Sequence, residues 1–171
     1  MVVVGRNAHI LGETGRTANV FLFTTAYSAL QDVPIVDAAI AYDCSFTGKN
    51  YVLICQNALS IPSMKHNLIP PFIMREANVV VNECPKIQQK NPVVEDHSIW
   101  FPGASFRIPL SLRGIFSYFL TRKLTRDKMQ SCDNVLVMTP QSHAWNPHLD
   151  MYARNEENML NWEGNMLESH H

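Results

Sequence analysis

Apolar and polar residues alternate most regularly in two stretches, residues 33–43 and 50–59, which are separated by a short polar connection. Alternation with a period of two is typical of strands that bury one face. The connection contains Gly48, and glycine readily takes the positive φ angle that tight turns need. We therefore predict a β-hairpin whose turn is centred between Thr47 and Gly48.

This register gives the hairpin one largely apolar face. Its members alternate along both strands and are Val36, Ala38, Ile40, Tyr42, Leu53, Cys55, Asn57 and Leu59. Cys44 and Cys55 then fall four residues out of register, so they lie roughly 13 Å apart. A disulfide needs Cα atoms closer than about 7 Å. Because Cys84 and Cys132 are scattered elsewhere, we expect four free thiols and a reducing, cytoplasmic (intracellular) location.

The segment before the hairpin carries weaker signals. The β-branched run at residues 2–5 predicts a short strand ended by Gly5. We interpret residues 9–15 as a loop because Gly12 and Gly15 interrupt them. Residues 18–24 predict a mostly apolar strand, and residues 25–32 predict a helical turn.

After the hairpin, two consecutive prolines open a helix candidate at residues 70–77. Proline is tolerated in a first turn because its missing N–H has no helical partner there. Asn78 can end this helix in a left-handed conformation. A strand is predicted from residue 79 until Pro85 ends it, and residues 88–96 are predicted to form a surface loop.

A second hairpin is predicted from residues 97–101 and 106–112. Pro109 has no N–H to give to a sheet, so its strand should lie at an edge. The same alternation continues to Leu120, and we therefore expect one long strand bent at Gly114 rather than a tight turn. Residues 135–138 predict a last strand. We also predict a helix over residues 151–162, capped by Asp150, with a sparse apolar face.

Composition and charge indicate an ordinary globular protein. Of the 171 residues, 46% are hydrophobic and 17% are charged, with a net charge of −1. No apolar run reaches the ~18 residues of a membrane span, so we expect no membrane partner. The basic stretch at residues 122–128 is interpreted as a solvated connection, with a nucleic-acid contact as the less favoured alternative. We expect a β domain at residues 1–139 and a polar, partly helical tail at 140–171.

The sequence predicts no metal site and no cofactor site, and we expect the protein to use no cofactor. Cys-x-x-Cys and paired Cys/His spacings are absent. His143 and His148 lack the spacing of metal ligands, and His170 and His171 are interpreted as solvated side chains. Three carboxylates are interpreted as solvated groups: Asp32, Asp37 and Asp43.

Two further histidines are candidates that we assign to structure. Asp96, His97 and Ser98 resemble an acid–base set, but neighbours in a strand face opposite sides and form no relay. His66 is interpreted as a residue whose hydrogen bonds stabilise a turn. The sequence thus predicts no catalytic, no cofactor-binding and no metal-binding residue.

The stretch from residue 57 to residue 69 reads Asn-Ala-Leu-Ser-Ile-Pro-Ser-Met-Lys-His-Asn-Leu-Ile. It resembles a segment of the protease region in copia-type (Ty1/copia) LTR retrotransposon polyproteins. The hairpin at 36–43, the strand at 79–81 and the stretch 106–120 fit that resemblance in order. The resemblance implies a mainly β, retropepsin-like closed sheet or barrel. It also implies an aspartic endopeptidase that acts on polypeptide substrates as a homodimer.

The chain departs from that family at the residue that matters most for activity. Each subunit of such a protease supplies one Asp from an Asp-Ser/Thr-Gly-like turn, and two subunits together form the catalytic pair. In the family this turn directly precedes an apolar-apolar-Gly segment like Val3-Val4-Gly5, and no Asp-Ser/Thr-Gly occurs in the 171 residues. We therefore expect a protease-like domain that is truncated before the turn, lacks its first strand and is inactive as written.

Two rival functions remain open. A catalytically silent β domain would bind peptides or a second copy of itself through an unpaired strand edge. A small-molecule-binding barrel is less favoured, because no convergent polar groups are evident in the sequence. We expect neither membrane association nor direct nucleic-acid binding.

Overall fold

The computed structural model describes residues 1–21, 28–132, 134–141, 145–153 and 156–167. The fold is mainly β, as the alternating pattern predicts. The chain divides into two compact units, Met1–Gln141 and Ser142–His171. The boundary between the units, after Gln141, lies two residues beyond the boundary after residue 139 that composition suggested.

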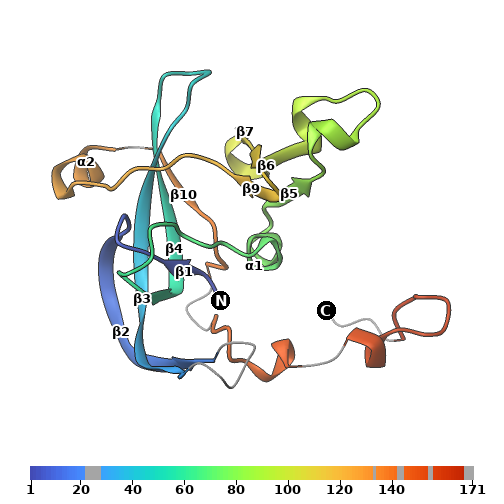
Figure 1. The fold of residues 1–171 in the computed structure, drawn as a ribbon, viewed down its shortest axis with the longest axis horizontal. Helices are drawn as coiled ribbons and strands as arrows, with labels where there is room; N and C mark the ends of the chain where they lie inside the picture. The colour runs from blue at the N-terminus through green and yellow to red at the C-terminus, as the bar shows by residue number, and fades with distance from the viewer. Residues whose placement is uncertain (22–27, 133, 142–144, 154–155, 168–171) are drawn as a thin grey trace. The chain divides into compact units, whose positions relative to one another are not determined.

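The larger sheet of the first unit has the order β1 (Val3–Val4), β4 (Asn50–Ser60), β3 (Leu30–Asp43) and β2 (His9–Val20) (Figure 1). A fifth strand, β10 (Val135–Val137), also pairs with β4. Both β1 and β10 run parallel to β4, at opposite ends of its length. Both strands pair with the edge of β4 that faces away from β3. The sequence pattern did not predict that β1 and β10 pair with β4.

The hairpin of β3 and β4 confirms the clearest sequence prediction. Its register differs from the prediction by two residues, because Ile40 pairs with Leu53. A shift of two keeps every side chain on its predicted face, and both of these residues are buried. Beyond Cys55 the pattern breaks at a β-bulge, where Asn57 has φ 53° and donates its N–H to Asp37 Oδ1 at 3.0 Å.

Strand β2 corrects the interpretation of residues 9–15 as a loop. These residues pair with β3 from His9 onward, through a ladder with several register shifts. Gly15 has φ 78° and lies in the shift between Glu13 and Thr17. The glycines therefore mark irregular pairing rather than a chain reversal. Of the helical turn predicted at 25–32, residues 25–27 lie outside the described residues, and residues 30–32 are strand.

A second, three-stranded sheet has the order β5 (Val80–Glu83), β6 (His97–Phe101) and β7 (Phe106–Pro109). Strand β7 lies at its edge, as Pro109 requires. Helix α1 (Pro71–Glu76) precedes β5, and Asn78 follows with φ 61°, which confirms both predictions. The rest of this region contains 3₁₀ turns, which are Lys86–Gln88, Val94–Asp96 and Pro102–Ala104.

The long strand predicted across Gly114 is wrong. The chain instead forms a small hairpin of β8 (Ser111–Arg113) and β9 (Phe116–Tyr118). Gly114 has φ 63°, which an L-residue adopts only with strain, and this angle allows a tight turn. Alternation continues across such a turn, so the sequence pattern alone did not distinguish the two structures.

Aromatic side chains join the second sheet to the first. Phe106 of β7 stacks on Tyr51 of β4 with ring centroids 4.0 Å apart, and its edge contacts Tyr42 of β3 at 6.0 Å. Phe119 adds an edge contact to Tyr42 at 5.8 Å. Arg122 extends this attachment, because its guanidinium bonds both oxygens of Asp43 at 2.7 and 3.0 Å. The chain then enters helix α2 (Arg126–Ser131).

Within the described residues, each of the sheets is open at both ends. The expected closed barrel is therefore not seen. In the second unit, the predicted helix is also wrong in the part that the structure describes: it contains 3₁₀ turns at Asp150–Tyr152 and Glu156–Met159 and a bridge between Leu160 and Met166. Sparse apolar positions give this segment no face to bury. Among the described helices, none has the length and apolar content needed to span a membrane.

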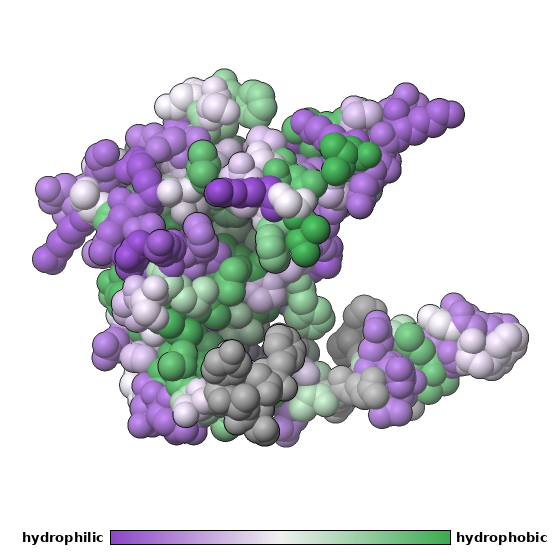
Figure 2. Space-filling model, viewed as in Figure 1, coloured by the Kyte–Doolittle hydropathy of each residue, from purple (hydrophilic) through white to green (hydrophobic). Residues whose placement is uncertain are grey.

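The first unit exposes several large apolar side chains. Figure 2 shows hydrophobic residues reaching the surface in separate groups among hydrophilic ones. On and beside the small hairpin, Ile115 is 87% exposed, Phe116 is 71% exposed and Leu120 is 79% exposed. These values contrast with Leu53 of β4, which is fully buried.

Candidate functional site

The His-Asn-Leu turn, part of the stretch that carries the family resemblance, lies against the Val3-Val4-Gly5 segment near the start of the chain. Backbone hydrogen bonds join Val3 and Leu68 in both directions, at 2.9 and 2.8 Å. Beside them, the Gly5 N–H donates to Asn67 Oδ1 at 2.8 Å. The segment that begins the chain is thus bound to the His-Asn-Leu turn, although more than 60 residues separate them.

Gly5 is required by this contact. A Cβ atom at its position would lie 2.4 Å from the backbone oxygen of Met64, which is closer than real Cβ contacts come. The next residue, Arg6, donates its N–H to the same oxygen at 3.1 Å. His66 is exposed, and its side chain makes no hydrogen bond to any residue that the structure describes. The side chain that stabilises the turn is therefore that of Asn67, which corrects the role expected for His66.

This arrangement positions the backbone and contains no group that carries out chemistry. Asn67 supplies a fixed amide oxygen, and the other partners are backbone atoms. An acceptor that replaces water on a half-buried N–H contributes about 0.5–1.5 kcal/mol. The contact can thus fix the path of the chain as it enters β1, but it supplies neither an acid nor a nucleophile.

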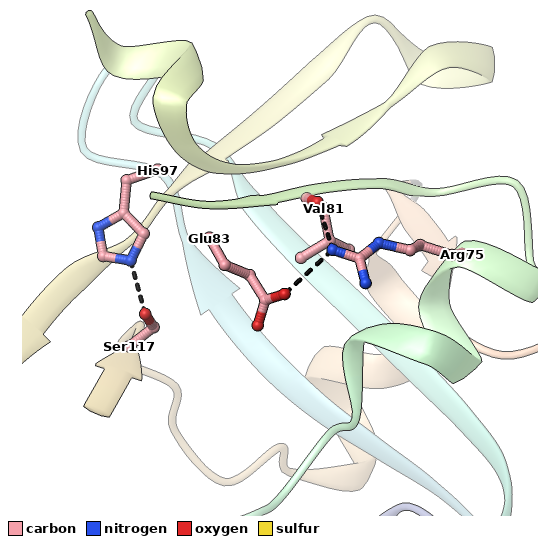
Figure 3. A network of polar contacts seen from close by, with 5 residues as sticks. All are labelled: Arg75, Val81, Glu83, His97 and Ser117. Carbon is pink, nitrogen blue, oxygen red and sulfur yellow. Dashed lines mark hydrogen bonds and ion pairs between the residues drawn. The ribbon is translucent and has the colours of Figure 1, made fainter. Parts of the chain in front are cut away.

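A second group of polar residues lies between β6 and β9. His97 Nε2 lies 2.6 Å from Ser117 Oγ (Figure 3). His97 is only 2% exposed, whereas Ser117 is exposed. Burial lowers the pKa of His97, and Lys86 lowers it further, while Glu83 acts in the opposite sense. The imidazole is therefore neutral at pH 7.

Glu83 and Arg75 continue this network on its other side. Glu83 pairs with His97 in the register of β5 and β6. Its carboxylate, however, accepts from Arg75 at 3.0 Å and is turned toward that residue in Figure 3. Arg75 also donates to the backbone oxygen of Val81 at 2.9 Å. Arg75 thus ties α1 to β5.

Asp96, His97 and Ser98 take separate partners, as the strand alternation predicts. Asp96 accepts from the backbone N–H of Val93 at 2.9 Å. Ser98 donates to the backbone oxygen of Glu95 at 3.1 Å and accepts from a guanidinium at 2.7 Å. No relay joins the three. Sequence reasoning missed the contact of His97 with Ser117, because the two residues lie 20 positions apart on different strands.

Of the other candidate carboxylates, Asp43 and Asp37 accept hydrogen bonds, whereas Asp32 is held through its backbone N–H. Arg122 holds the pKa of Asp43 below its usual value, chiefly through their hydrogen bonds. Asp37 accepts from the bulged backbone at Asn57. The backbone N–H of Asp32 is bound by a side-chain oxygen of the neighbouring strand. None of these contacts resembles a pair of carboxylates sharing a proton.

The described residues contain no group of three or more His, Cys, Asp or Glu side chains that could hold a metal ion. His143, His170 and His171 lie outside those residues. All four cysteines have free thiols in the structure. Burial raises the pKa of Cys55 to about 12, so this thiol stays protonated and unreactive.

Comparison of the chain with protein-family models, with curated proteins and with solved structures gave no match.

Proposed function

We propose that this chain is the protease-like domain of a copia-type retrotransposon polyprotein, retropepsin-like in fold and without peptidase activity of its own. The observation that carries the proposal is the contact between Gly5 and Asn67. The His-Asn-Leu turn belongs to the stretch that carries the resemblance, and Val3-Val4-Gly5 is like the segment that follows the catalytic turn in that family. In this chain the two segments form one hydrogen-bonded unit. Chance similarity of two short segments gives no reason for them to meet.

The absence of activity follows from the chemistry of the family. Hydrolysis needs two carboxylates about 3 Å apart that share one proton. The sequence contains no Asp-Ser/Thr-Gly turn to supply such a carboxylate. Asp37 and Asp43 are engaged by other groups, so they do not replace it.

The proposal also assigns partners and a compartment. An aspartic protease of this family takes a polypeptide substrate and pairs with a second copy of its own chain. The four free thiols fit a reducing, cytoplasmic setting. No cofactor is needed for the proposed role.

The test is a pepstatin-sensitive peptidase assay at mildly acid pH. It compares the 171-residue chain with a version to which an added Asp-Ser/Thr-Gly-like turn and its strand are joined before Val2. The matched control carries Asn in place of the catalytic Asp of that turn. We expect activity only in the extended version with its Asp intact. Peptidase activity of the 171-residue chain would contradict the proposal.

A second candidate is a catalytically silent β domain that associates with itself or with peptides. The exposure of Ile115, Phe116 and Leu120 favours it, because large apolar side chains left exposed on a protein surface often mark interaction sites. If neither version of the chain cleaves peptides, this candidate becomes the better account. Sedimentation of the chain and of its Phe116→Ser variant then tests it, since a silent self-associating domain loses dimer when the apolar surface is reduced.

A further inference from the structure

The contact of His97 with Ser117 joins a buried residue, which carries the imidazole, to an exposed one, which carries the hydroxyl. The 2.6 Å separation is at the short end for a hydroxyl and a nitrogen acceptor. When Nδ1 carries the ring proton, Nε2 accepts the hydroxyl proton of Ser117. The serine then lies between a base and the solvent.

We propose that Ser117 is a nucleophile activated by His97, and that it reacts with small acyl or phosphonyl electrophiles such as activated esters and fluorophosphonates. A serine becomes nucleophilic when an adjacent base can take its proton as the oxygen attacks. This activity goes beyond the protease-like function proposed above and does not depend on it.

The electrostatic setting keeps the base in its useful form. The groups that face His97 from neighbouring elements are Glu83 on β5 and Lys86 in the following 3₁₀ turn. Arg75 neutralises Glu83, so this carboxylate is turned away from the imidazole. Burial and Lys86 then dominate and lower the pKa of His97. A neutral imidazole can accept a proton, whereas imidazolium cannot.

The local surface indicates the class of electrophile. Leu112 pairs with Ser117 across the small hairpin and is half-buried. Cross-strand partners share a face of the ladder, so Leu112 offers an apolar contact beside the hydroxyl. Phe116 and Tyr118 lie on the opposite face of β9. A short apolar acyl or alkylphosphonyl group fits this face better than a charged one.

The step balances without another reactant. Ser117 Oγ forms a bond to the carbonyl carbon or phosphorus, and its proton passes to His97 Nε2. The bond to the leaving group breaks, and that group leaves as fluoride or as an alkoxide. An alkoxide takes the proton from His97 and departs as an alcohol, whereas with fluoride the imidazolium gives its proton to water. The neutral imidazole is restored in both cases.

The experiment incubates the purified chain with a fluorophosphonate probe and follows adduct formation by intact-mass spectrometry and peptide mapping. We expect a single adduct on Ser117 and none in Ser117→Ala. The matched control is Ser111→Ala, because Ser111 is an exposed serine on the same hairpin. We expect His97→Gln to label about 100-fold more slowly, which is the size of a general-base contribution.

The pH profile of the wild-type chain separates activation from a structural role. We expect the labelling rate to fall as His97 is protonated, with a midpoint below 6.5, the ordinary pKa of histidine. This measurement decides the question if His97→Gln does not fold. No adduct, labelling spread over several serines, or a rate that does not follow the protonation of an imidazole would each overturn the proposal.

Discussion

The two hairpins β3–β4 and β8–β9 are built from similar patterns but end in opposite environments. Both are antiparallel, alternate apolar with polar residues and have a glycine with positive φ in or beside the turn. The first has strands of 14 and 11 residues, and its interior is almost fully buried. The second has strands of three residues each and leaves Phe116 exposed.

The difference comes from neighbours rather than from the strands themselves. Strand β3 pairs with β2 on its other edge, and β4 pairs with β1 and β10. The small hairpin forms a sheet of only two strands, and such hairpins are marginal by themselves. Alternation therefore indicates that a segment is a strand, whereas the number of elements packed around it decides whether its apolar face is buried.

The largest effects are expected where buried side chains are shortened, and the centre of β4 is the first example. Leu53 is fully buried and pairs with Ile40, so Leu53→Ala should destabilise the chain by about 2–5 kcal/mol. Leu120→Ala is the matched control, because the same deletion on an exposed side chain should change stability by less than about 0.5 kcal/mol. Urea unfolding followed by circular dichroism measures both. Equal effects would show that burial does not distinguish the two regions.

A smaller effect is expected where β1 meets the His-Asn-Leu turn. Gly5→Ala places a methyl group against the backbone oxygen of Met64 and should cost about 1–3 kcal/mol. Gly12→Ala meets no atom within 4 Å and should be near neutral or slightly stabilising. Thermal melting of the two variants provides the comparison. A neutral Gly5→Ala would mean that the contact does not hold β1 in place.

The third prediction concerns pH and the attachment of the small hairpin. The folded-state pKa of His97 lies below its unfolded value of about 6.5. The unfolded chain then binds more protons between these values, so stability should fall as the pH drops below about 6.5. Denaturant unfolding at several pH values should show this loss, and His97→Gln should show less of it. If the stability of His97→Gln falls with decreasing pH as steeply as that of the wild-type chain, the loss comes from groups other than His97.

The smallest effect is expected on the small hairpin itself. Phe116→Ser removes a side chain that is 71% exposed and should change the free energy of unfolding by less than about 0.5 kcal/mol. Phe106→Ala is the contrasting variant, because Phe106 is buried against Tyr51 and should cost about 3–5 kcal/mol. Chemical denaturation of the pair measures the contrast. A large loss in Phe116→Ser would mean that this surface is covered in solution.

Several features of the fold were determined by the sequence alone. The period of two at residues 33–43 and 50–59 predicted the central hairpin and its buried face. Two prolines and Asn78 predicted the position of α1 and the end of its turn. Pro109 predicted an edge strand, because its missing N–H excludes it from the middle of a sheet. These predictions succeeded because each depends on local backbone geometry or on which side a strand buries.

Other features were decided only by tertiary structure. The pairing of β1 and β10 with one edge of β4, the bulge at Asn57 and the contact of His97 with Ser117 all join residues that are distant in sequence or displaced in register. Gly114 illustrates the same limit within a short segment, because alternation fits a bent strand as well as a tight hairpin. A local pattern fixes the direction of each side chain, but only packing of the whole chain selects which partner that side chain meets.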